Sequence, residues 1–178
     1  MKVGVFAVLF SQRPLGEALD YIKATGCDAV EIGTGGYPGN AHCDPAALLK
    51  DDQALSSFKN EFSSRQLEIS ALSCHGNPLH PDKSIAGAHD RDFRNTVQLA
   101  EKLGVPNVIT FSGCPGDSET SQKPNWVTCP WPTDYLDILE WQWEKVARPY
   151  WSEAASFAGK HNVRVAIELH PGFVAYHT

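Results

Sequence analysis

Acidic and imidazole side chains follow the most apolar segments of this sequence. Glu168 and His170 come directly after the apolar run 163–167, and Glu31 and His75 lie at the ends of two earlier apolar runs. A carboxylate that follows an apolar strand is poorly solvated, so it binds a cation or takes up a proton, and both suit acid–base chemistry. We therefore expect Glu168 to be catalytic and to bind a metal; the alternative is an ordinary ion pair with Lys or Arg.

Two histidines near these carboxylates are candidate substrate contacts. His170 lies two positions after Glu168 and points to the same side of an extended strand, although Pro171 follows it and a loop-shaping role is the alternative. His75 is expected to contact substrate or metal; the alternative is a structural histidine whose ring is hydrogen-bonded within the protein. Neighbours in a strand point to opposite faces, so Cys74 is not expected to be a nucleophile activated by His75.

A glycine-rich stretch, "GTGGYPGNAHCD" at 33–44, contains a further candidate. His42 stands where the backbone approaches a ligand closely, so we expect a substrate contact, with an exposed loop histidine as the alternative. Glycine-rich turns bind anions through backbone N–H groups, yet neither the G-x-G-x-x-G fingerprint nor the phosphate-loop Lys is present. His80 is a lesser candidate on the next loop.

Short apolar runs alternate with helical periods along the whole chain, which is typical of βαβ units around a parallel sheet. The expected strands are 2–10, 29–33, 67–74, 107–113 and 163–170. The carboxyl ends of parallel strands meet at one edge, where open sheets and (β/α)₈ barrels place their ligand sites. The polar residues that end these strands are therefore expected to converge.

Four helical segments are expected between the strands, and their bounds are 14–25, 44–65 with interruptions, 89–103 and 135–161. Asp44 before Pro45 predicts a helix start, Gly104 predicts a helix end, and Pro149 predicts a kink or break. The loop 113–134 is long and contains Trp126 and Trp131, so we expect a packed lid.

Composition limits the classes of protein. The chain has 178 residues, 42% of them hydrophobic, and we expect residues 1–178 to form a single domain. A net charge of −6 speaks against nucleic acid as a partner, and the N-terminal apolar run is too short to predict a signal peptide or a membrane span. Five cysteines without a C-x-x-C pair predict a reducing, cytoplasmic setting.

Five segments together carry a family resemblance: "VEIGTGGYPG", "ISALSCHGNPLHP", "VITFSGCPG", "NWVTCPWP" and "AIELHPGF". They resemble the sugar phosphate isomerase/epimerase family, the xylose-isomerase-like (β/α)₈ barrels, in its N-terminal part. The resemblance implies an α/β fold, a partial (β/α)₈ TIM barrel of about five parallel strands with flanking helices. A doubly wound sheet of five strands is the alternative fold.

The resemblance also implies a site. Family members hold one divalent ion, manganese, magnesium, zinc or cobalt, through glutamate, aspartate, histidine and glutamate from strands five to eight, and Glu168 matches the first ligand. Such enzymes move a proton beside a carbonyl through an enediolate, with a small sugar or polyol as substrate. Glu31 and His75 match positions that line the pocket in relatives.

These 178 residues end after the fifth expected strand, before the other ligands that the resemblance implies. We therefore expect weak or no activity from these 178 residues alone. The predicted function is a sugar or sugar-phosphate isomerase or epimerase. Alternatives are an inosose-type dehydratase or lyase on the same barrel and a non-catalytic carbohydrate-binding protein; the acidic charge disfavours an endonuclease acting at abasic DNA. Assembly as a homo-oligomer is left open.

Overall fold

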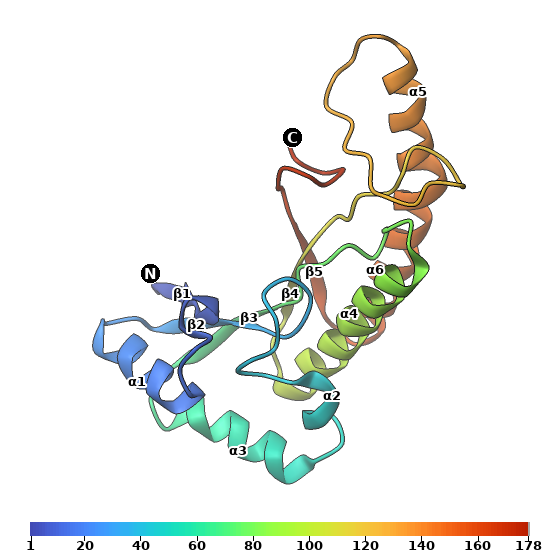
Figure 1. The fold of residues 1–178 in the computed structure, drawn as a ribbon. Helices are drawn as coiled ribbons and strands as arrows, with labels where there is room; N and C mark the ends of the chain where they lie inside the picture. Colours follow the sequence, from blue (N-terminus) through green and yellow to red (C-terminus); the bar gives the residue numbers. More distant parts are fainter. Residues whose placement is uncertain (178) are drawn as a thin grey trace.

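The computed structural model describes residues 1–177 and contains a sheet of five parallel strands. In spatial order they are β1 (Gly4–Phe6), β2 (Ala29–Gly33), β3 (Glu68–Ser73), β4 (Asn107–Phe111) and β5 (Arg164–Glu168) (Figure 1). A doubly wound sheet reverses its strand order at one point, whereas this order runs without reversal, as in a (β/α)₈ barrel. The expected partial barrel is confirmed, and the doubly wound alternative is wrong.

Helical segments connect the strands and lie along one side of the sheet, as Figure 1 shows for α1, α3, α4 and α6. Their bounds are η1 (Ala7–Phe10), α1 (Leu15–Ala24), α2 (Pro45–Leu48), α3 (Asp52–Ser63), α4 (Lys83–Leu103), α5 (Asp134–Trp141), η2 (Gln142–Ala147) and α6 (Arg148–Lys160). Within residues 1–177, no helix has both the length and the apolar character needed to cross a bilayer.

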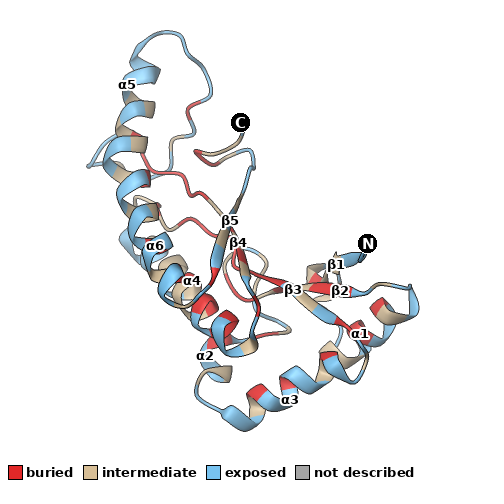
Figure 2. Cartoon of the chain, turned by 180° about the vertical axis from the view of Figure 1, so that it is seen from behind, coloured by how far each residue is buried: buried red, intermediate tan, exposed pale blue. Residues whose placement is uncertain are grey.

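Alternate residues of each strand face two different environments, because side chains in a strand alternate between its faces. Val30, Ile32, Leu72 and Val108 are buried in the main hydrophobic core beside the helices. Figure 2 shows the buried residues along the strands and on the helix surfaces turned toward them. The opposite face is only partly covered and carries the polar residues, so the helices leave this face open for the site.

Local capping explains where several helices begin and end. The side chain of Asp44 accepts hydrogen bonds from the N–H groups of Ala46 and Ala47, which begins α2 as predicted. Asp82 caps α4 through the N–H of Ser84, so this helix begins six residues earlier than the predicted 89. Gly104 ends α4 with a left-handed φ of 73°.

Two further predicted elements differ from the structure. The apolar run 2–10 is a short strand followed by the 3₁₀ turn η1, because a short apolar run has no period that separates a strand from a buried turn. The predicted helix 135–161 is continuous in direction but contains the π-helical turn η2 immediately before α6. Pro149 has no N–H, and its ring crowds the carbonyl four residues before it. The wider π turn accommodates the ring, so the helix continues without a break.

Candidate active site at the carboxyl ends of the strands

A histidine from the loop after β3 and a glutamate at the end of β5 meet on the open face of the sheet. His75 Nε2 lies 2.8 Å from Glu168 Oε2, although the two residues are 93 positions apart in the chain. The His75 side chain is 5% exposed and that of Glu168 is 49% exposed. An ionised carboxylate only accepts hydrogen bonds, so Nε2 of His75 is the donor. The pair combines a fixed imidazole with an accessible carboxylate.

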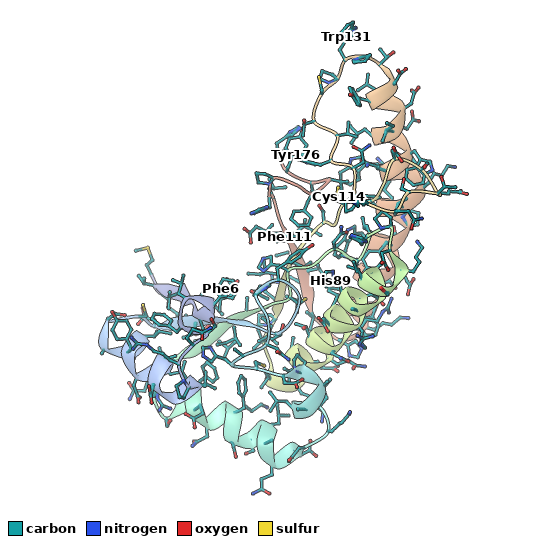
Figure 3. The ribbon with its side chains drawn as sticks, in the orientation of Figure 1. Phe6, His89, Phe111, Cys114, Trp131 and Tyr176 are labelled. Atoms are coloured by element: carbon teal, nitrogen blue, oxygen red, sulfur yellow. The ribbon has the colours of Figure 1, made fainter. Side chains whose placement is uncertain are left out.

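Aromatic rings surround this pair. Phe111 lies beside Glu168 in the strand register, and its ring centroid is 4.4 Å from that of His75 and 4.7 Å from that of His170. Phe173 stacks on Phe111 at 4.3 Å, and Phe6 of β1 lies 6.1 Å from His75. Figure 3 shows Phe6 and Phe111 coming from opposite parts of the sheet. The rings hold the His75 imidazole in place and give the site an apolar wall.

His170 lies next to this wall with a defined hydrogen bond. Its Nδ1 atom is 2.7 Å from the backbone oxygen of Pro171. A carbonyl oxygen can only accept, so Nδ1 donates this hydrogen bond and Nε2 is not used by it. The structure therefore brings His75, Glu168 and His170 together around Phe111.

Glu31 lies on the same face of the sheet, in the middle of β2. Ser73, which is buried, donates a hydrogen bond from its hydroxyl to the Glu31 carboxylate. Glu31 also lines a cavity of about 290 Å³ together with Phe6, Ser70 and Glu68. Because Phe6 contacts His75 as well, this cavity adjoins the site.

Other sequence candidates lie elsewhere. His42 is partly buried, and its Nε2 atom lies 2.9 Å from the backbone oxygen of Arg13, apart from the His75 and Glu168 pair. His80 accepts a local hydrogen bond from the N–H of Asp82. Burial raises the pKa of the Cys74 thiol to about 12, so this thiol stays protonated near neutral pH and is a poor nucleophile.

Residues that the sequence interpretation missed complete the wall. Phe111 is the last residue of β4, directly before Ser112, and strand alternation places Phe111 on the open face. The next residue, Ser112, is a polar residue at the same strand end, but its hydroxyl is used within the protein. It accepts a hydrogen bond from the N–H of Ala175. Alternation along β4 is the signal that identifies Phe111: Val108 and Thr110 face the helices, so Phe111 faces the open side of the sheet.

The lid predicted at 113–134 is only partly packed. Gln142 donates hydrogen bonds to the backbone oxygens of Gly116 and Asn125, which fixes the base of the loop. Trp131, near its tip, is 75% exposed, and α5 has no buried residue. Figure 3 shows Trp131 at the far end of this projection. The expectation of a packed lid is therefore wrong at the tip, because no part of the described chain reaches it.

The side chains of this site provide only part of what a metal ion needs as ligands. Glu168 offers a half-exposed carboxylate, and its hydrogen bond with His75 uses Oε2. Carboxylate oxygens are ligands for magnesium, manganese and zinc. Among residues 1–177, however, no three His, Cys, Asp or Glu side chains are grouped to hold a metal ion. The described residues therefore supply one suitable ligand and not a complete set.

Residues 19–177 match the sequence pattern of the family described as xylose isomerase-like TIM barrel. The Bacillus subtilis (strain 168) protein YfiH is 34% identical over 172 residues, a match that covers 94% of this chain and 54% of YfiH. The chain therefore spans about half the length of this curated relative.

Solved structures share the fold at lower identity. The IolI protein with a bound zinc atom is 18% identical, with a TM-score of 0.63 over 98% of this chain and 54% of IolI. L-ribulose 3-epimerase is 17% identical, with a TM-score of 0.58 over 97% of this chain and 50% of the epimerase. At such identities the likeness establishes the fold, and it again extends over about half of each neighbour.

Proposed function

The chain belongs to the family of xylose isomerase-like TIM barrels, and we propose that it carries one half of the active site of a metal-dependent sugar or sugar-phosphate isomerase or epimerase. The observation that supports this proposal best is the 2.8 Å hydrogen bond between buried His75 and half-exposed Glu168. The bond lies at the carboxyl ends of parallel strands, where barrels of this class place their catalytic residues. An L-ribulose 3-epimerase among the structural neighbours agrees with this class of reaction.

In the proposed reaction, Glu168 takes a proton from the carbon next to a substrate carbonyl. Its carboxylate is accessible enough to reach a sugar, and strand β5 fixes its backbone. The same carboxyl group returns the proton to the neighbouring carbon for isomerisation, or a second group returns it to the opposite face for epimerisation. His75 holds one oxygen of Glu168, so the other oxygen faces the substrate in a fixed orientation.

Glu168 is also the residue that we propose as a ligand for a divalent ion, with manganese, magnesium, zinc and cobalt as the predicted choices. A bound ion of this kind polarises the substrate carbonyl. The zinc atom of the IolI neighbour supports a metal at this site. The described residues hold no set of three such donors, so Glu168 is the single ligand that this proposal assigns among them.

We also propose that His170, Glu31 and His42 contact the substrate. His170 is exposed beside Phe111, and its bond to Pro171 leaves Nε2 available for a hydrogen bond with a sugar hydroxyl. Glu31 lines the adjoining cavity, whereas His42 reaches a substrate only if it leaves the carbonyl of Arg13.

Proton exchange tests this proposal directly. The purified chain is incubated with D-fructose or L-ribulose in D₂O with Mn²⁺, and NMR follows loss of the proton next to the carbonyl. In line with the weak activity expected of these 178 residues alone, we expect slow exchange that EDTA and Glu168→Gln abolish, while Glu119→Gln, at an exposed carboxylate, retains it. Equal exchange rates for the native chain and Glu168→Gln would contradict the proposal, and a dehydrated product would favour the lyase alternative.

A further inference from the structure

The backbone N–H groups of the glycine-rich turn after β2 are hydrogen-bonded to other groups of the protein. Four consecutive N–H groups donate hydrogen bonds: Thr34 to Ser73 O at 2.8 Å, Gly35 to Gly39 O at 3.1 Å, Gly36 to Asp92 Oδ2 at 3.1 Å and Tyr37 to His75 O at 2.7 Å. A turn that binds phosphate needs several free N–H groups that point at the anion. This turn has none among these four residues, so its glycines serve another purpose.

That purpose is a close approach to the backbone of His75. Gly36 has a φ of 66°, and a Cβ atom there would lie 2.0 Å from the backbone oxygen of His75. At Gly35, with a φ of 147°, a Cβ atom would lie 2.9 Å from Asp92 Oδ2. Only glycine allows both contacts. The turn is therefore attached to the residue whose side chain bonds Glu168, and to α4 through Asp92.

The residue that this turn places is Tyr37. Its ring centroid lies 5.3 Å from that of His89 and 6.3 Å from those of both Phe111 and Phe173. Figure 3 shows His89 and Phe111 close together at this end of the sheet. Despite these contacts Tyr37 is 61% exposed. Part of the side chain therefore packs on the wall of the site, and much of it is open to solvent.

We propose that Tyr37 is a substrate-binding residue whose ring stacks on the C–H face of a sugar bound beside Glu168. This inference rests on the proposed function. The face of an aromatic ring carries a partial negative charge and attracts the weakly positive C–H groups of a sugar, while contact also removes apolar area from water. The hydrogen bond from the Tyr37 N–H to His75 anchors the backbone, and the contacts with His89, Phe111 and Phe173 orient the ring beside the carboxylate that acts on the substrate.

Sugar binding to the 178-residue chain tests the proposal. D-fructose and D-tagatose are titrated by saturation-transfer NMR, and dissociation constants are compared for the native chain, Tyr37→Phe, Tyr37→Leu and Tyr37→Ala. Loss of stacking is expected to raise the dissociation constant roughly three- to tenfold for the Leu and Ala variants, whereas Phe keeps the native value. Tyr135→Ala removes an exposed tyrosine on α5 and serves as the matched control. Circular dichroism verifies that each variant is folded.

The outcomes separate this inference from the proposed function. Native affinity of Tyr37→Leu and Tyr37→Ala would overturn the role of Tyr37, and so would the absence of measurable ketose binding to the native chain. If Tyr37→Ala binds normally while Glu168→Gln loses proton exchange, the inference fails and the proposed function stands. If Tyr37→Ala weakens binding while Glu168→Gln exchanges normally, Tyr37 remains a sugar contact and the proposed catalysis fails.

Discussion

The side chain of Asn77 is hydrogen-bonded twice to the backbone of Cys114. Asn77 Nδ2 donates to the Cys114 oxygen at 2.9 Å, and Asn77 Oδ1 accepts from the Cys114 N–H at 2.8 Å. Asn77 is buried and its Oδ1 also accepts from the N–H of Leu79. This amide therefore joins the loop after β3, which contains His75, to the loop after β4. The two loops hold the wall of the site as one unit.

Asn77→Ala is expected to destabilise the chain strongly. The substitution leaves three buried backbone groups without their partner, so we expect the free energy of unfolding to fall by about 2–4 kcal/mol. Urea denaturation followed by circular dichroism measures the change. Asn60→Ala, on the exposed surface of α3, is the control and is expected to change stability by less than about 0.5 kcal/mol. Equal effects of the two variants would show that the Asn77 bonds contribute little.

Gly36→Ala tests the attachment of the turn to His75. A Cβ atom at this position would overlap the His75 oxygen at 2.0 Å, so the turn must move and the bond from Tyr37 is lost. We expect a loss of roughly 1–3 kcal/mol in the free energy of unfolding. Gly39→Ala is the matched control, since Gly39 has a similar φ of 72° but no atom within 4 Å of a Cβ. A cost at Gly36 no larger than that at Gly39 would mean that backbone strain alone explains the result.

The cysteine thiols are expected to react at very different rates. Burial raises the pKa of both Cys43 and Cys74 to about 12, and it raises the pKa of Cys114 to about 11. Cys129 is exposed. Treatment of the native chain with a disulfide reagent near neutral pH should therefore modify Cys129 quickly, and the three buried thiols only after unfolding. Mass spectrometry of tryptic peptides identifies the modified sites, and rapid labelling of Cys74 in the folded chain would contradict its burial.

Tyr150 makes stability depend on alkaline pH. Its hydroxyl donates to Asp90 Oδ1 at 2.9 Å, and burial together with the Asp90 charge raises the pKa of Tyr150 far above 10. The unfolded chain therefore loses this proton first as the pH rises above about 10, and the free energy of unfolding falls. The effect is absent below that pH.

Tyr150→Phe is expected to lose the hydrogen bond to Asp90 and also to reduce this decline by up to about 1.4 kcal/mol per pH unit above pH 10. Urea denaturation at pH 8, 10 and 11 measures the slope. The buried thiols contribute a similar decline in both proteins, so the comparison isolates Tyr150. The same slope in Tyr150→Phe and in the native chain would exclude Tyr150 as its source.

Local sequence patterns predicted the elements more reliably than their contacts. Asp44 with Pro45 and Gly104 marked helix ends correctly, because capping depends on residues only a few positions apart. Pro149 marked the right region but not the π turn that replaces a break, since the outcome depends on how the helix packs. The exposure of Trp131 was missed for a related reason: whether a loop aromatic is covered depends on which distant segment reaches it.

The sequence alone determined the alternation of strands and helices, the apolar face that packs on the helices, and the placement of Glu168 and His75 at strand ends. These features follow from periodicities of a few residues, which side-chain alternation and helix geometry translate directly into faces. Tertiary structure decided that His75 bonds Glu168, that Phe111 and Phe173 form the wall, and that the glycine-rich turn attaches Tyr37 to the backbone of His75. These pairs join segments far apart in the chain, so they exist only once the sheet order and the loop geometry bring those segments together.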